Sequence, residues 1–373
     1  MKARFIALLV LLCGCAPVRQ LEAFVERQPD PITDQGAHRS AVEWWYMNGH
    51  LETQAGVKKG FAAAIFQVYI PESTKIGLIS AASVLPQAFY FGHYSLLDKA
   101  TGSFSSKERS TLPFVKNPNI RVSDAGASES RMDVHLADWR MTREQNGHYT
   151  VSASNNGQDA INLDLEPLRP EVVHGPGWSG NLETGRMYYY SATRLKVTGT
   201  LNGEQVTGLV WFDHQWGGGI GAQAGDGSTS FAPNWDWMSL QLEDGRDIMI
   251  YVVKNAKNEI SDKFISITAG EGKSTELRNF RFQPWDTWTS PATGGKYPTK
   301  WSLRLEDGTI LTIRAVTDNQ EVEARATTGF NYYEGAVSVT GTTRGVGYME
   351  LTGYVKGSSP FSNPWQTLQN GGR

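Results

Sequence analysis

One strand-and-turn segment occurs twice in the sequence, and it limits the folds that the chain can adopt. VTGTLNG (197–203) returns as VTGTTRG (339–345). LQLEDG (240–245) likewise returns as LRLEDG (303–308). A supersecondary unit that recurs at a long spacing is typical of two copies of one architecture. We therefore predict two similar halves built from strands.

Tight turns join the predicted strands, and no segment of ordinary length shows the period of a helix. Asn202-Gly203 and Asp244-Gly245 stand between apolar or alternating runs, as two-residue hairpins require. An antiparallel sheet of this kind removes its open edges by closing, and a barrel of roughly eight strands can hold one small ligand. We predict an all-β protein with two antiparallel β-barrels, whose interiors are rich in the 12 Trp, 14 Tyr and 15 Phe residues.

The first fifteen residues have the features of an export signal. Lys2 and Arg4 precede an apolar run that is too short for a membrane span, and the run ends in LCGC, with Cys15 last. This ending is similar to a bacterial lipobox, whose final cysteine becomes the lipidated first residue of the mature chain. The alternative is an ordinary signal peptide in which Cys15 is incidental. The resemblance to other lipoproteins implies, because Ala16 and not an aspartate follows the cysteine, a chain anchored through Cys15 at the periplasmic face of the outer membrane. No cysteine follows Cys15, so we expect the exported chain to have no disulfide.

These patterns divide the chain into five predicted parts. A Gly-rich stretch between the two halves marks the boundary between them. The parts are a signal peptide (1–14), a tether (15–40), a first barrel (41–220), a second barrel (221–356) and a polar tail (357–373).

Several functional classes find no support in the composition or the motifs. A net charge of −3, with 20% charged residues, gives no basic surface for nucleic acid. GGGIGA (217–222) has the spacing of a dinucleotide loop, but no strand–helix–strand pattern surrounds it. GWSGN (177–181) lacks the closing glycine of a hydrolase nucleophile elbow. The seven histidines form no H-E-x-x-H pair, so we expect neither a metal site nor a cofactor.

Two aromatic segments beside the predicted boundary hold the candidate catalytic residues. In FDHQWGGG, His214 and Trp216 share one face of a strand and Asp213 points the other way. In NWDWMSLQL, Trp237 lies on the face opposite to Asp236. A carboxyl group among rings has a raised pKa and can act as an acid, and a histidine can relay a proton near neutral pH. The alternative is structural: the carboxylates hold strand ends and His214 is a satisfied core residue.

A third aromatic segment, EWWYMNGHL (43–51), begins the first predicted strand. Trp44 or Tyr46 can line a ligand cavity, and indole faces can stabilise a carbocation without supplying a nucleophile. The alternative is that these rings belong to the core, which is the common place for large aromatic side chains. We expect Trp44, Tyr46, Trp237 and Asp213 to line a ligand pocket.

Six segments together resemble one family. EWWYMNGHL, FGHYSLLD, YYYSATRLKVTGTL, GLVWFDHQWGGG, NWDWMSLQLEDG and YYEGAVSVTG…GYMELTGY occur in order from about Glu43 to Tyr354 and are similar to the carotenoid 1,2-hydratases and AttH-like proteins. The resemblance implies two lipocalin-like β-barrels in tandem and a hydrophobic ligand site near their junction. It also implies a hydratase chemistry in which Asp236 protonates an isoprenoid double bond, His214 activates water and Trp216 assists.

The chain departs from the hydratase pattern in two places, and two kinds of function stay open. Asn234 stands where the resemblance leads us to expect tyrosine, and the export signal is unusual for enzymes of pigment synthesis. The first function is a cofactor-independent hydro-lyase acting on a lipid or isoprenoid-like molecule. The second, implied by the AttH-like branch, is a non-catalytic lipid-binding component of an ABC transport system or an envelope scaffold.

Overall fold

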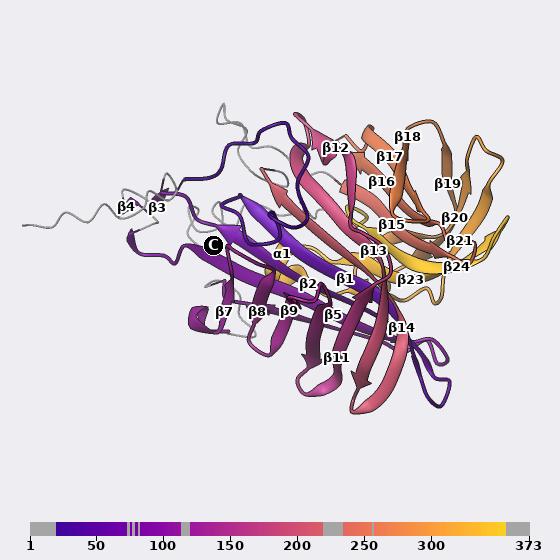
Figure 1. Cartoon of the computed structure of the whole chain (residues 1–373), viewed down its shortest axis with the longest axis horizontal. Coiled ribbons are helices and arrows are strands. Elements are labelled where there is room, and N and C mark those ends of the chain that lie inside the picture. The colour runs from indigo at the N-terminus through magenta and orange to yellow at the C-terminus, as the bar shows by residue number, and fades with distance from the viewer. Residues whose placement is uncertain are drawn as a thin grey trace, which may run out of the picture.

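The computed structural model describes residues 20–72, 75–76, 79–80, 83–112, 120–218, 234–255 and 257–355, which form two large antiparallel sheets (Figure 1). The predicted signal peptide, Cys15 and the tail 357–373 lie outside the described residues. The first sheet contains β1 (Val42–Thr53), β2 (Lys58–Tyr69), β5 (Ala88–Asp98), β6 (Phe104–Ser110), β7 (Ala125–Ala127), β8 (Asp133–Leu136), β9 (Trp139–Arg143), β10 (Tyr149–Asn155), β11 (Gln158–Pro167), β12 (Val172–Asn181), β13 (Gly185–Leu201) and β14 (Glu204–Gly217). The second contains β15 (Asn234–Leu242), β16 (Asp247–Lys254), β17 (Ile260–Ala269), β18 (Lys273–Leu277), β19 (Arg281–Thr289), β20 (Lys296–Arg304), β21 (Ile310–Ala315), β22 (Glu321–Val322), β23 (Tyr332–Gly341) and β24 (Gly345–Leu351). A short ribbon, β3 (Lys75–Ile76) with β4 (Ile79–Ser80), a 3-10 turn (Val122–Asp124) and the one-turn helix α1 (Arg325–Thr328) are the remaining described elements.

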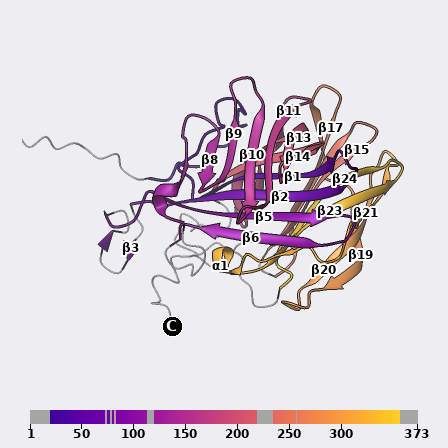
Figure 2. The same cartoon turned by 90° about the horizontal axis from the view of Figure 1, so that it is seen from below.

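Each large sheet curls into a half-barrel, and the two stand side by side (Figures 1 and 2). The strand order is β6-β5-β2-β1-β14-β13-β11-β10-β9-β8-β7 in the first sheet and β18-β17-β16-β15-β24-β23-β21-β20-β19 in the second. The predicted all-β class, with two tandem lipocalin-like antiparallel barrels, is confirmed.

The predicted hairpins form where the turn dipeptides stand. Asn202 and Gly203 join β13 to β14, and both have positive φ (51° and 83°), as a type I′ turn requires. Gly245 (φ 88°) lies in the turn between β15 and β16. The local sequence therefore fixes the connection and the register of these strand pairs.

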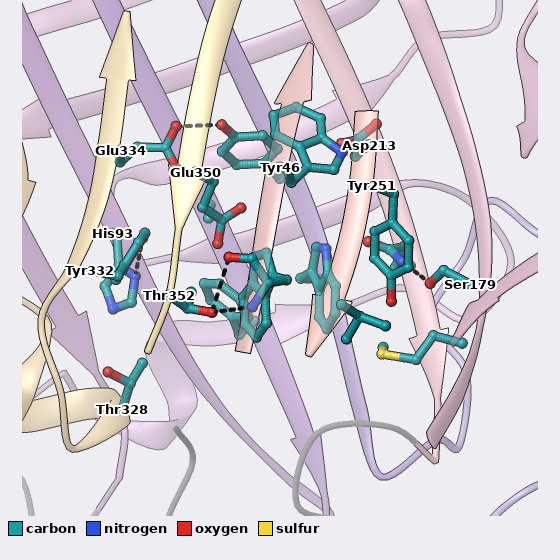
Figure 3. Close-up of a pocket in the computed structure, with 18 of the residues that line it drawn as sticks. Tyr46, His93, Ser179, Asp213, Tyr251, Thr328, Tyr332, Glu334, Glu350 and Thr352 are labelled. Atoms are coloured by element: carbon teal, nitrogen blue, oxygen red, sulfur yellow. Dashed lines mark hydrogen bonds between the residues drawn. The ribbon is translucent and has the colours of Figure 1, made fainter. Parts of the chain in front are cut away.

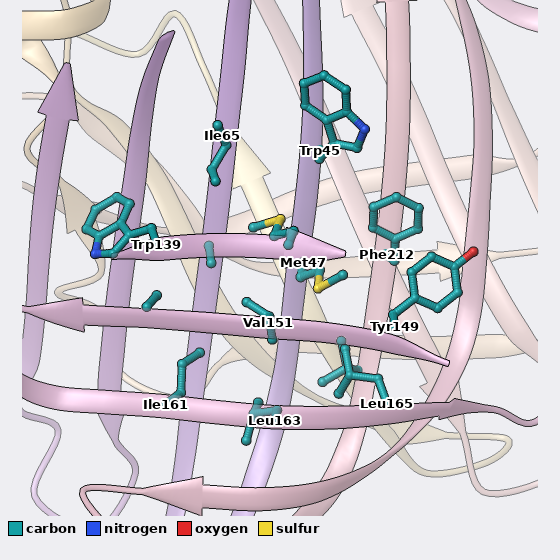
Figure 4. Packing of buried hydrophobic residues seen from close by; sticks show 14 of the residues in the cluster. Trp45, Met47, Ile65, Trp139, Tyr149, Val151, Ile161, Leu163, Leu165 and Phe212 are labelled. Atoms are coloured by element: carbon teal, nitrogen blue, oxygen red, sulfur yellow. The ribbon is translucent and has the colours of Figure 1, made fainter. Parts of the chain in front are cut away.

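The two faces of the central strands are both buried, but against different neighbours. On β1, Trp45 and Met47 point into the first barrel, where they join a cluster that includes Tyr149 and Phe212 (Figure 4). On β15, Met238 belongs to the corresponding cluster inside the second barrel. Because side chains alternate along a strand, the intervening residues face outward. These outward faces meet and form a third buried cluster between the barrels.

The contact between the barrels combines apolar packing with buried polar links. The shared cluster includes Tyr189 and Trp211 from the first sheet and Met249 and Tyr348 from the second. Gly60 on β2 permits this approach, because a Cβ there would lie 2.7 Å from the Tyr348 hydroxyl. The two sheets therefore pack as closely as layers of one core.

The segment that we expected to be a tether is, from residue 20 onward, packed against the first sheet. The Phe24 ring stacks on Tyr188 with ring centroids 4.7 Å apart, and the backbone N–H of Val25 donates to the Tyr188 hydroxyl. The His38 ring stacks on Trp216 at 4.1 Å. Aromatic contacts thus hold this segment on the barrel.

The described helical segments are few and short. None of them forms a helix that is both apolar and long enough to span a bilayer.

Candidate functional site

A pocket lies between the two half-barrels, with about 870 Å³ of empty space that is partly open to solvent (Figure 3). Nine of the 21 residues that line it carry aromatic rings. The rings are Trp44, Tyr46, Phe66, His93, Trp235, Trp237, Tyr251, Phe330 and Tyr332. A concave, mostly apolar space with a few polar groups is the usual form of a small-molecule site.

Strand register places three carboxyl groups in this aromatic pocket. Tyr46 on β1 is directly opposite Asp213 on β14. Glu334 on β23 is directly opposite Glu350 on β24, which in turn neighbours Trp237 on β15. Residues opposite one another in a ladder point to the same face, so all five side chains face the space between the barrels. No lysine or arginine is among the described residues that line it.

Glu334 is the most strongly perturbed of the three acids. Burial, followed by the nearby Glu350, holds the pKa of Glu334 well above its usual range. The Tyr46 hydroxyl donates to Glu334 Oε1 at 2.5 Å. Glu334 Oε2 is buried and has no hydrogen-bond partner within the described part of the chain. Burial therefore favours the neutral form of Glu334, and one of its oxygens has no hydrogen-bond partner among the described residues.

Glu350 and Asp213 have smaller shifts with different causes. Burial raises the pKa of Glu350 to about 8, with a further contribution from the charge of Asp213. Burial raises the pKa of Asp213 to about 7, although hydrogen bonds oppose the rise. Asp213 accepts bonds from the Trp211 indole N–H (2.6 Å), the Tyr189 hydroxyl (3.0 Å) and Ser191. Because these donors favour the carboxylate, Asp213 ionises before its neighbours do.

A chain of hydrogen bonds runs from the pocket wall to a half-buried carboxyl group. The Tyr332 hydroxyl is 2.9 Å from His93 Nδ1, and His93 Nε2 is 2.8 Å from Thr327 Oγ1. The Thr327 hydroxyl donates to Glu108 Oε2 at 2.8 Å. Burial lowers the pKa of His93 to about 3, so its ring is neutral and can accept a proton at one nitrogen while donating from the other.

Comparison with known proteins identifies the family of this chain. The profile of the AttH-like family matches residues 27–354. The chain belongs to the AttH-like family. No curated protein sequence matches it significantly.

Two solved structures resemble this AttH-like chain over nearly its whole length. A candidate AttH of Nitrosomonas europaea is 28% identical, with a TM-score of 0.73, over 90% of this chain and 100% of that one. Kievitone hydratase of Nectria haematococca is 16% identical, with a TM-score of 0.60, over 91% of this chain and 92% of that one. The second likeness concerns the fold alone.

The structure places the four predicted ligand-binding residues of this AttH-like chain together. Trp44, Tyr46, Trp237 and Asp213 all line the pocket. The Trp237 indole N–H donates to the Tyr189 hydroxyl at 2.9 Å, and this hydroxyl donates to Asp213, so one chain of bonds joins the two barrels.

The predicted catalytic residues do not share this pocket. His214 and Trp216 face the interior of the first barrel, on the side of β14 opposite to Asp213. Asp236 faces away from Trp237, and its carboxylate is bound by Lys254 (2.7 Å) and the Tyr354 hydroxyl (2.7 Å). Because side chains alternate along each strand, Asp236 and His214 both point away from the space between the barrels, on opposite sides of it. The hydration chemistry predicted for Asp236 and His214 stays a prediction. Neither residue lines the pocket between the barrels.

Sequence reasoning missed Glu334 and Glu350, which are two of the three acids that line the pocket. A signal was present, because each is a glutamate inside an otherwise apolar strand, in YYEGAVSV and GYMEL. Charged residues are rarely buried without a partner, so such a position indicates a special environment.

His214 belongs instead to a buried group in the first barrel. Its Nε2 lies 2.8 Å from Glu43 Oε1, and His38 Nδ1 lies 2.8 Å from the same oxygen. Burial alone would raise the pKa of Glu43, but the bonds from His214 and His38 outweigh it and the pKa is lowered. The partners Asp34 and Glu43 outweigh burial at His38 and raise its pKa to about 9. A cationic His38, an anionic Glu43 and a neutral His214 therefore form a balanced set.

Proposed function

We propose that this protein binds an apolar, unsaturated small molecule in the pocket between its barrels and adds water to it without a cofactor. The single observation that carries the proposal is the free oxygen of Glu334, a buried neutral acid facing an aromatic pocket. A lipid or isoprenoid-like ligand suits a wall of this composition.

Glu334 and Asp213 have the properties of an acid and a base working in one site. Glu334 is held neutral by burial and by the other acids, whereas three donors favour the anionic form of Asp213. Environments that push two pKa values apart in this way assign the acid and base roles.

The reaction balances with these two groups alone. Glu334 transfers its proton to one carbon of a C=C bond, and the cation that forms on the other carbon is stabilised by the surrounding rings. Water forms the new C–O bond and gives a proton to Asp213. The cycle closes when Asp213 loses this proton and Glu334 regains one. The chain Glu108–Thr327–His93–Tyr332 provides a route for protons to the pocket wall.

We also propose that the chain is exported and held at the membrane through a lipid on Cys15. The LCGC ending of the apolar run supports this proposal. Growth with an alkyne-tagged fatty acid should label the protein, and Cys15→Ser should abolish the label. A labelled Cys15→Ser variant would exclude Cys15 as the acceptor.

Mass spectrometry of organic extracts from the protein, purified from its native host, tests the ligand. An isoprenoid or polyene supports the proposal. A bound phospholipid would instead favour the carrier function of an ABC transport system, and a folded protein with an empty extract would argue against stable ligand binding.

Incubation of the identified ligand with enzyme in ¹⁸O-water tests the chemistry. We expect one labelled hydroxyl group in the product, and we expect Glu334→Gln to lower the rate by roughly 100-fold or more while the ligand still binds. The matched control is Asp236→Asn, a buried acid outside the pocket, which should keep activity in proportion to folded protein. Loss of turnover in Asp236→Asn, with turnover retained in Glu334→Gln, would return the role of acid to Asp236.

A further inference from the structure

The side chains of His38, Glu43 and His214 are of the types that bind metal ions, and other polar groups lie next to them. His38 Nδ1, His214 Nε2 and a Glu43 oxygen all lie within 4.8 Å of one another. His38 and Glu43 are five residues apart, in the N-terminal segment and at the start of β1, and His214 comes from the distant strand β14. Two imidazoles and one carboxylate are a ligand set that zinc uses when one coordination position stays open.

From this arrangement we infer that the first barrel contains a zinc-type divalent metal site whose protein ligands are His38 Nδ1, Glu43 Oε1 and His214 Nε2. This site is separate from the pocket between the barrels and does not depend on the function proposed for that pocket.

Each of the atoms that point away from the site has another polar group near it. His214 Nδ1 lies 3.0 Å from the Tyr190 hydroxyl, and His38 Nε2 lies 3.9 Å from Asp34 Oδ1. Glu43 Oε2 accepts the backbone N–H of His38 at 2.7 Å. Metal ligands are characteristically oriented by outer partners of this kind, including a carboxylate behind a histidine. The inward atoms, by contrast, have only one another as partners in the described structure.

The distances allow a metal after a small outward movement. Ligand atoms at roughly 2.1 Å from a tetrahedral zinc ion are about 3.4 Å apart. The two N···O separations are 2.8 Å, which is the spacing of hydrogen bonds, so each has to open by roughly half an ångström. The proton of each ring then belongs on its outward nitrogen, where Tyr190 and Asp34 stand.

One of the three ligands borders a cavity that is partly open to solvent. His38 lines a second cavity, of about 640 Å³ and partly open, together with Gln67 and Tyr90. Glu43 and His214 are fully buried and do not line this cavity, so a metal ion and a fourth, water ligand have to enter past His38. The carboxylate also provides the negative charge that a divalent ion requires. The sequence contains no continuous zinc motif because His214 joins His38 and Glu43 only in the folded barrel.

Metal analysis of the purified full chain, stripped by chelator and dialysed against zinc, tests the inference. We expect one zinc per chain. The X-ray absorption spectrum at the zinc edge should show N/O ligands at roughly 2.0–2.1 Å and the outer-shell scattering of imidazole rings. His38→Ala and His214→Ala should abolish stoichiometric binding. Tyr190→Phe should weaken it by roughly 10–100-fold, because it removes only an outer partner.

The matched control is His148→Ala, which removes a histidine that is paired with Asp164 on another strand of the same barrel. It should bind zinc as the unaltered chain does. Should a site variant fail to fold, the absorption spectrum of the unaltered chain still decides. Absence of stoichiometric zinc, a spectrum without imidazole, or full binding by folded His38→Ala and His214→Ala would each overturn the inference.

Discussion

The Tyr46 hydroxyl on β1 donates a hydrogen bond of 2.5 Å to Glu334 Oε1 on β23, so one bond links the two barrels at the wall of the pocket. Both residues are buried. The bond orients Glu334 so that its second oxygen is the one left without a partner. A contact between the barrels thus also positions the acid that we assign to catalysis.

Tyr46→Phe should destabilise the protein although it keeps the ring. The change leaves Glu334 Oε1 buried without its donor, which typically costs about 1–3 kcal/mol of unfolding free energy. Urea denaturation of Tyr46→Phe, Glu334→Gln and the double variant measures the coupling. A coupling energy near zero would show that the two side chains do not interact in solution.

Glu350→Gln should change how stability depends on pH. Because the pKa of Glu350 is raised to about 8 in the folded chain, its neutral form stabilises the fold fully below the unfolded pKa near 4.5. That contribution is lost as the pH rises from there through 8. Glu350→Gln cannot ionise, so at pH 8.5 we expect it to be more stable than the unaltered chain by roughly 2–4 kcal/mol, with little difference at pH 5. Thermal unfolding across this range measures the effect, and parallel stability curves for the two proteins would contradict it.

The sequence was sufficient for the all-β class and the hairpin at Asn202-Gly203. The four residues predicted to bind a ligand lie in the wall of one pocket, and their role in binding stays a prediction. The class, the hairpin and these positions depend on turn chemistry and on alternation within one strand, which are local properties. The assignment of Asp236 and His214 to one site required knowing which face of each sheet meets the other barrel. That choice depends on packing between strands far apart in the chain. The pairing of Asp236 with Lys254 likewise exists only in the assembled sheet.

His93 should remain a neutral imidazole in a single tautomer from pH 8 down to about pH 4. Burial lowers its pKa to about 3, and both ring nitrogens have hydroxyl partners, from Tyr332 and Thr327. Nitrogen-15 NMR of the histidine rings, with His93→Gln used to assign the signal, tests this expectation. A His93 signal that titrates near pH 6.5 would mean that the ring is solvated and cannot belong to the proposed route for protons.

A buried ionic link between the barrels centres on Asp247 at the start of β16. Arg194 on β13 reaches Asp247 Oδ1 at 2.6 Å, Arg169 reaches Oδ2 at 3.0 Å, and the Thr193 hydroxyl also donates to Oδ2. The carboxylate is fully buried, and both arginines are mostly buried. The charges of both arginines are therefore compensated by one carboxylate that is shielded from water.

Asp247→Ala should be the most destabilising of the substitutions predicted here. Removing one partner of a buried ion pair leaves an uncompensated charge and costs about 3–5 kcal/mol. The control is Asp244→Ala, because Asp244 pairs with Arg246 in the nearby turn while partly exposed, and such a pair contributes about 0–1 kcal/mol. Urea denaturation should therefore show a much larger loss of unfolding free energy for Asp247→Ala. Equal losses for the two variants would mean that this ionic link does not hold the barrels together.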